Sequence, residues 1–404
     1  MKKIVAVVGL ICILGTGIIL GTMAVQSVKN SFENYINKDK VGQSETSVNI
    51  EESKREVDTE NDSESEETIV ENNHVNNDKE NNQTDDDNNA AIEREESQES
   101  QKSQDSEESK ALMDNGILGS EEKENDSVEV ISAAVSALNI INPAINIEAT
   151  NAILMDCETG NVLYHKNAMM PIYPASTTKL MTALVALDLC DITEEITIGE
   201  EVGFIASDSS RAYLKEGQRL TMQMLLEGAI VPSGNDAAYV IAAYCGRKIL
   251  DNRDADAKTA IRAFVNQMNE KAKELGLISS QFMNPDGYDE EGQYTTAYDM
   301  GIIAMEAIKS LTIRTISGKS SARNIFLSGE DVTWKTSNKL INTGSGMYYQ
   351  YAIGLKTGTS SHAGRCLVSA AEKDGKKYIS VVMNSTSAGR WEDSIDLLSY
   401  GIEH

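Results

Sequence analysis

The chain has 404 residues and a net charge of −27 at pH 7, and most of that charge lies in one segment. Residues 31–130 hold 31 Asp and Glu against 9 Lys and Arg, a net charge of −22. A chain this acidic repels phosphate backbones, so we expect no nucleic-acid partner. The length allows two average domains, but the uneven composition favours a single globular unit.

The N-terminus predicts a membrane segment over residues 1–30. After Lys2 and Lys3, the 22 residues from Ile4 to Val25 carry no charge, and as a helix they span about 33 Å, enough to cross a bilayer. This length favours a retained anchor over a cleaved signal peptide, although Thr22-Met23-Ala24 resembles a cleavage site. With Lys2 and Lys3 on the cytoplasmic side, the chain after residue 30 is predicted to be extracytoplasmic, or secreted if the N-terminal segment is cleaved.

Residues 31–142 are predicted to form an acidic, disordered stalk. Their Glu, Asp, Asn, Ser and Gln, with almost no aromatic residues, cannot bury enough apolar surface to offset chain entropy. A flexible coil of about 100 residues reaches roughly 50–60 Å. The stalk would therefore hold the following domain away from the bilayer.

Periodic patterns begin near Ile147 and predict an α+β domain over residues 143–404. Early and late strands flank a run of helices, so we expect an antiparallel sheet that pairs the first strands with the last. The expected strands are 152–156, 161–165, 351–356, 365–372 and 377–384, and the expected helices are 176–189, 222–230, 236–250, 260–275, 298–309 and 393–400.

Three short motifs follow one another in this domain: Ser176-Thr177-Thr178-Lys179, Ser233-Gly234-Asn235 and Lys356-Thr357-Gly358. Serine β-lactamases and penicillin-binding proteins carry this set in this order. Serine and lysine at positions i and i+3 of a helix share one face, which places an amine beside a hydroxyl. The lysine can accept the hydroxyl proton if burial or a second cation, for which Lys356 is a candidate, lowers its pKa.

The remaining motif residues fit a two-step acyl transfer. Ser176 would attack while Lys179 accepts its proton, and Ser233 would relay a proton to the leaving group. Asn235 would hold a substrate carbonyl, and the N–H groups of Ser176 and Thr359 are candidate oxyanion donors.

The third motif is predicted to bind the substrate. Lys356 and Thr357 precede Gly358, whose missing side chain would let an extended peptide approach the strand edge.

From about residue 143 to 400 the chain resembles the low-molecular-mass penicillin-binding proteins, the serine D-Ala-D-Ala carboxypeptidases. Beyond the motifs, the resemblance lies in the segments "MDCETGNVLYHKNAMMPIYPASTTKLMTAL", "SDSSRAYLKEGQRLTMQMLLEGAIVPSGNDAAYVIA", "FMNPDGYDEEGQYTTAYDM" and "GLKTGTSSHAGRCLVSAAE". It implies the penicillin-recognising fold, an antiparallel sheet flanked by helices with an all-helical subdomain. It also implies peptidoglycan stem peptides ending in D-Ala-D-Ala as substrate and β-lactams as covalent inhibitors.

The same resemblance bears on two individual residues, Arg390 and Asp286. Arg390 in "SAGRWEDS" matches an arginine that helps bind the terminal carboxylate of the substrate in the family. Asp286 stands where relatives often have histidine, which leaves the role of that position open.

Other functions fit the sequence less well. A serine β-lactamase shares the motifs, but no E-x-x-L-N segment lies between Asn235 and Lys356 to supply the deacylating glutamate of class A enzymes. A non-catalytic penicillin-binding or sensor protein would be expected to lose a motif residue. H-E-x-x-H and G-x-S-x-G are both absent, which argues against a metallopeptidase and a Ser-His-Asp hydrolase.

The cysteines indicate neither a metal site nor a redox motif. Cys157, Cys190, Cys245 and Cys366 are scattered without C-x-x-C spacing, so buried free thiols are favoured. We expect no metal ion and no organic cofactor.

Overall fold

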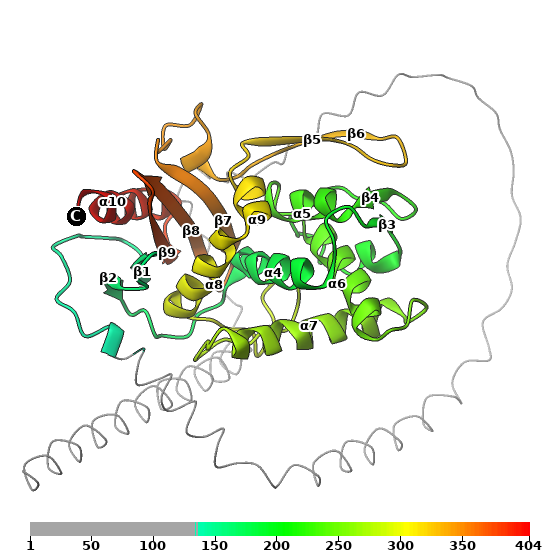
Figure 1. Cartoon of the computed structure of the whole chain (residues 1–404), viewed down its shortest axis with the longest axis horizontal. Coiled ribbons are helices and arrows are strands. Elements are labelled where there is room, and N and C mark those ends of the chain that lie inside the picture. Colours follow the sequence, from blue (N-terminus) through cyan, green and yellow to red (C-terminus); the bar gives the residue numbers. More distant parts are fainter. Residues whose placement is uncertain (1–133, 135) are drawn as a thin grey trace, which may run out of the picture. The chain divides into compact units, whose positions relative to one another are not determined.

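The structure is a computed structural model that describes residue 134 and residues 136–404 (Figure 1). The predicted membrane segment at 1–30 and most of the predicted stalk at 31–142 lie outside the described residues, so both stay predictions. None of the helices in the described part of the chain combines the length and the apolar character that a membrane span requires.

A five-stranded antiparallel sheet forms one half of the domain, in the order β2-β1-β9-β8-β7 (Figure 1). Its strands are β1 (Asn151–Asp156), β2 (Val162–Lys166), β7 (Ala352–Ser360), β8 (Gly364–Lys373) and β9 (Lys376–Ser385). The first strand pairs with the last, as the sequence predicts, and β7 lies at the sheet edge.

Helices cover both faces of this sheet. Successive strand residues point to opposite faces, so in β9 Ile379 and Val381 pack into the core shared with the central helices. Tyr378 and Val382 pack on the other face, in a cluster that includes residues of α10 (Gly389–Glu403). The central strands are therefore buried on both sides, and their edge neighbour β7 is held in a fixed position.

The segment between β2 and β7 is mainly helical and wraps around α4 (Figure 1). Its helices are α4 (Lys179–Leu189), α5 (Met222–Ile230), α6 (Asn235–Ile249), α7 (Ala257–Glu274), α8 (Ala297–Lys309) and α9 (Leu311–Ser317). All but α9 were expected within a few residues. Two short hairpins were not predicted, β3 (Glu195–Thr197) with β4 (Arg219–Thr221) and β5 (Ser321–Ile325) with β6 (Asp331–Lys335).

Several predicted boundaries are wrong: the terminal helix expected at 393–400 spans all of α10, and α7 begins at Ala257 rather than at residue 260. Two of the wrong boundaries fall on motifs. The expected helix at 176–189 begins instead as a 3-10 turn, η1 (Ala175–Thr178), before α4. The expected strand at 351–356 continues through Gly358 to Ser360, because its pairing with β8 persists to that point. The third motif thus lies inside an edge strand that packs against η1.

Candidate active site

The amine of Lys179 makes the central contacts of the site. Its Nζ donates to Ser176 Oγ at 2.9 Å, to Asn235 Oδ1 at 2.7 Å and to the backbone oxygen of Asp286 at 2.9 Å. Lys179 has no exposed surface, and this burial lowers its pKa to about 8, while the charges of Asp286 and Asp236 act to raise it. A buried amine of this kind can accept a proton from the hydroxyl that it touches.

Of the two routes that the sequence left open for lowering this pKa, burial is the leading cause. The motif separation of three residues spans η1 and the first residue of α4, which still places both side chains together.

The Asn-Pro-Asp-Gly segment at 284–287 supports the turn that carries Ser176. Thr182 Oγ1 donates to Pro285 O at 2.6 Å, which ties the segment to α4. Gly287 has φ 85°, and a Cβ there would lie 1.8 Å from the backbone oxygen of Ala175. Only glycine allows this approach, so the segment fixes the residue before the nucleophile candidate.

The second motif forms a tight loop between α5 and α6. Ser233 has φ 65°, and its Oγ accepts a hydrogen bond of 2.8 Å from Lys356 Nζ. A Cβ on Gly234 would lie 2.7 Å from Gly228 O, so this loop also requires close backbone packing. Asp236 accepts from the N–H groups of Ala212 and Leu214, which anchors the start of α6. The loop therefore places Ser233 beside Lys356 and Asn235 beside Lys179.

The third motif connects the strand edge to both other motifs. Lys356 is buried, and its Nζ also donates to Thr357 O at 3.0 Å. The hydroxyl of Thr357 lies 2.7 Å from that of Ser337, a residue that the sequence analysis missed. A Cβ on Gly358 would lie 3.2 Å from Pro174 O, so the missing side chain makes room for η1, and Gly358 also lines the first of the two cavities described below. Its predicted approach to a ligand stays a prediction.

Arg390 lies on α10 behind the strand edge. Its Nη1 donates to Thr359 Oγ1 at 3.1 Å, and its guanidinium stacks over Trp391 at 4.3 Å. Only 3% of Arg390 is exposed. The structure thus brings Arg390 to Thr359, while its predicted contact with a substrate carboxylate stays a prediction.

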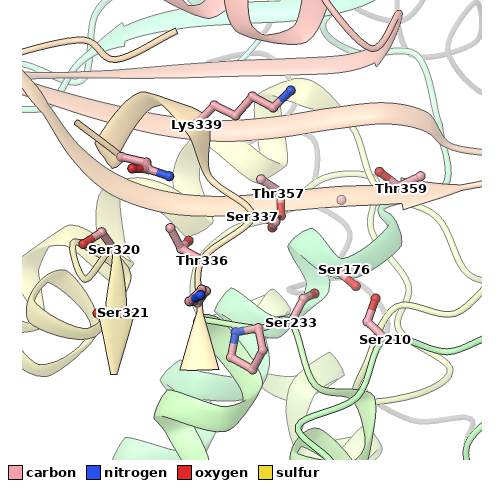
Figure 2. Close-up of a pocket in the computed structure, with 14 residues that line it drawn as sticks. Ser176, Ser210, Ser233, Ser320, Ser321, Thr336, Ser337, Lys339, Thr357 and Thr359 are labelled. Atoms are coloured by element: carbon pink, nitrogen blue, oxygen red, sulfur yellow. Dashed lines mark hydrogen bonds between the residues drawn. The ribbon is translucent and has the colours of Figure 1, made fainter. Parts of the chain in front are cut away.

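Two cavities meet at Ser176. The first, of about 480 Å³, extends past Ser233 and Thr357 toward the β5–β6 hairpin (Figure 2). The second, of about 320 Å³, extends past Asn235 and Thr359. Figure 2 shows the hydroxyl groups of Ser176 and Ser233 on the helical side of β7. Together the cavities form a cleft along the strand edge in which a peptide can lie across Ser176.

No cysteine of the described residues lines either of these two cavities. In the described part of the chain Cys157, Cys190, Cys245 and Cys366 are free thiols, the last three of them buried. Cys190 Sγ and Cys245 Sγ lie 3.4 Å apart. The expectation of free thiols is confirmed for these four residues, with Cys157 only partly buried.

An antiparallel sheet with a mainly helical subdomain, joined at a serine–lysine pair, defines a serine acyl-transfer protein of the penicillin-recognising fold. The chain belongs to the D-alanyl-D-alanine carboxypeptidase family, whose model matches residues 137–387. The predicted family and fold class are therefore confirmed.

Individual relatives agree with this assignment. The chain is 32% identical over 249 residues to the D-alanyl-D-alanine carboxypeptidase DacF of Bacillus subtilis. This match covers 59% of this chain and 58% of DacF. It is 33% identical to the D-alanyl-D-alanine carboxypeptidase of Streptomyces sp. K15, over 66% of this chain and 91% of that protein. The crystal structure of the Streptomyces K15 DD-transpeptidase superposes with a TM-score of 0.59 at 32% identity, covering 66% of this chain and all of that one.

Proposed function

We propose that this protein is a serine D-alanyl-D-alanine carboxypeptidase that removes the terminal D-alanine from peptidoglycan stem peptides. The observation that carries the proposal is the buried amine of Lys179 at 2.9 Å from Ser176 Oγ, at the junction of a peptide-sized cleft. The family membership supports the same reaction.

In the first half of the reaction, Ser176 Oγ forms a bond to the carbonyl carbon of the penultimate D-alanine while Lys179 Nζ accepts the hydroxyl proton. The carbon–nitrogen bond then breaks, and D-alanine leaves with the proton that Lys179 accepted, relayed through Ser233, whose Oγ is hydrogen-bonded to Lys356. Lys179 is thereby neutral again. The N–H groups of Ser176 and Thr359 are assigned to the oxyanion.

In the second half, water attacks the ester on Ser176, and Lys179 serves as base for that water. The shortened peptide leaves, and the proton returns to Ser176 Oγ. A β-lactam follows the first half and stays bound as a stable ester, which makes it a covalent inhibitor. We further propose that the domain acts on the wall side of a bacterial membrane, tethered through residues 1–30.

Mass spectrometry of the full-length protein with benzylpenicillin, and separately with a peptide ending in D-Ala-D-Ala, tests the proposal. A lasting adduct on Ser176 together with free D-alanine is expected. Ser176→Ala should abolish both, whereas Ser399→Ala, on α10 and outside both cavities, should change neither. Rapid release of hydrolysed penicillin without D-alanine would instead indicate a β-lactamase, and the absence of any adduct a non-catalytic protein.

A second activity, transfer of the acyl group to an amine, is suggested by the likeness to the Streptomyces K15 DD-transpeptidase. The two activities differ only in the nucleophile that attacks the ester on Ser176, which is an amine in a transpeptidase and water in a carboxypeptidase. Adding glycine as an acceptor separates the two, because a transpeptidase forms a peptide ending in glycine while a strict carboxypeptidase forms only the shortened acid.

A further inference from the structure

Helices α4 and α6 pack against each other, and each begins with a residue of the site (Figure 1). Lys179 is the first residue of α4 and Asn235 the first of α6, and their side chains meet at 2.7 Å. Cys190 lies 11 residues after Lys179 (179 to 190), and Cys245 lies 10 residues after Asn235 (235 to 245). Ten residues of helix span about 15 Å, so the two cysteines lie at matching depths along the pair of helices.

The thiols of Cys190 and Cys245 touch at this second meeting point. Their Sγ atoms lie 3.4 Å apart, and the two residues are 55 positions apart in the chain. The S–S distance of a disulfide is about 2.05 Å, so the sulfur atoms have to approach by only about 1.4 Å to form one. Cys190 follows the last residue of α4 in extended backbone, which leaves it freer to move than Cys245 inside α6. The two thiols are therefore placed for oxidation to a disulfide.

The surroundings give the two thiols different reactivity. The hydrogen bond with Cys245 lowers the pKa of Cys190, and Lys248 acts in the same direction, against burial and the charge of Glu194. The same hydrogen bond, together with burial, raises the pKa of Cys245. An ion pair of 2.8 Å with Glu194 holds the amine of Lys248. Because the thiolate is the nucleophile in disulfide exchange, Cys190 is the first of the two to react.

We propose that Cys190 and Cys245 are the site of a disulfide that joins α4 to α6. The structure holds this pair in its reduced form. The proposal rests on the proposed location on the wall side of the membrane, because disulfides persist in extracytoplasmic compartments. Since 6% of Cys190 and none of Cys245 is exposed, the bond forms while the domain folds or opens locally.

The reaction is thiol–disulfide exchange with an oxidant that itself contains a disulfide. The Cys190 thiolate forms a bond to one sulfur of the oxidant and displaces the other sulfur as a thiolate. The Cys245 thiolate then attacks Cys190 Sγ and displaces the second sulfur. The two cysteines together lose two electrons and two protons, and the oxidant gains them and leaves as two thiols.

Peptide mapping of the full-length protein tests the proposal. The purified protein is reduced, incubated with oxidised glutathione just below its unfolding midpoint, and alkylated with iodoacetamide in denaturant without reductant. Trypsin should then release one peptide that joins residues 180–211 to residues 220–247, and only the other three of the five cysteines should be alkylated. Reduction before alkylation should separate the two peptides. Alkylation of all five cysteines, or glutathione left on Cys190 of the wild type, would overturn the proposal.

Two variants show which thiols react. Cys245→Ser should stop at the mixed disulfide between glutathione and Cys190, because the second nucleophile is missing. Cys157→Ser is the matched control, since Cys157 is a half-buried thiol in the turn after β1, and it should yield the same joined peptide as the wild type. A joined peptide in Cys245→Ser would mean that another cysteine is the partner of Cys190.

A second measurement asks whether the bond fastens the helices that carry the site. Closing a loop of 55 residues should raise the midpoint of thermal unfolding, followed by circular dichroism, by roughly 5–15 °C over the reduced protein. The oxidised protein should also keep its labelling by benzylpenicillin after heating between the two midpoints. Equal midpoints would refute this role of the bond.

Failure of the proposed function is a separate outcome, because the joined peptide is detected without any turnover. If the joined peptide forms but the wild type releases no D-alanine, the disulfide site stands and the proposed reaction falls. Release of D-alanine without a joined peptide gives the opposite result.

Discussion

The buried amine of Lys179 predicts a steep dependence of acylation on pH. With a pKa of about 8, lowered by burial, the amine is protonated below that pH and cannot accept the proton of Ser176. The neutral fraction is about one eleventh at pH 7 and about ten elevenths at pH 9, because each pH unit from the pKa changes the ratio tenfold. The second-order rate constant of acylation should therefore rise about tenfold between these values, with its midpoint near pH 8.

The measurement is the rate of covalent labelling by a fluorescent penicillin, well below saturation, between pH 6 and pH 10. Circular dichroism over the same range separates chemistry from unfolding. Lys179→Arg is the sharpest variant, because a guanidinium stays protonated throughout. It should label about 100- to 10,000-fold more slowly, the range of general base catalysis, without a midpoint. A flat wild-type profile, or an arginine variant within tenfold of wild type, would refute Lys179 as the base.

Three further predictions concern the surroundings of the site. Asp286→Asn removes a charge that raises the pKa of Lys179, so the midpoint of the labelling profile should move to lower pH, and a rise would contradict this. Gly287→Ala should cost about 3 kcal/mol or more in thermal unfolding, through overpacking and a left-handed backbone, whereas Gly375→Ala, with a similar φ and open space, should cost about 1 kcal/mol. In the reduced protein Cys190 and Cys245 are buried, so iodoacetamide should modify both thiols only in denaturant. If mass spectrometry detects modification of either thiol in the native protein, the buried packing of these two residues is contradicted.

The long helices and strands were predicted well, because each has enough residues to show a recognisable pattern of apolar side chains. β9 alternates between two buried faces, and α4 is apolar over most of its length. The β3–β4 hairpin has only three residues in each strand, too few to show alternation. Helix α9 follows α8 after Ser310 alone, and its seven residues form only two turns. Ser310, whose Oγ caps the N–H of Ile313, was the available signal for it.

The motifs located most of the site's side chains but not the backbone groups that complete it. The contact from Lys179 to the oxygen of Asp286 could not be predicted, because a backbone acceptor has no signature in the sequence. Ser337 was missed for a related reason, since it lies in an irregular segment that reaches β7 only through the tertiary fold.

Gly287 and Gly234, which lie in or near the motifs, help to position the side chains of Ser176 and Ser233. Ala175 and Ser233 have φ values of 47° and 65°, a left-handed conformation that costs non-glycine residues about 1 kcal/mol or more each. Such strain persists only where the surroundings enforce it, and here Gly287 and Gly234 supply the close backbone packing. Because that packing aims one hydroxyl at Lys179 and the other at Lys356, a methyl group at either glycine should disturb acylation before it disturbs the sheet.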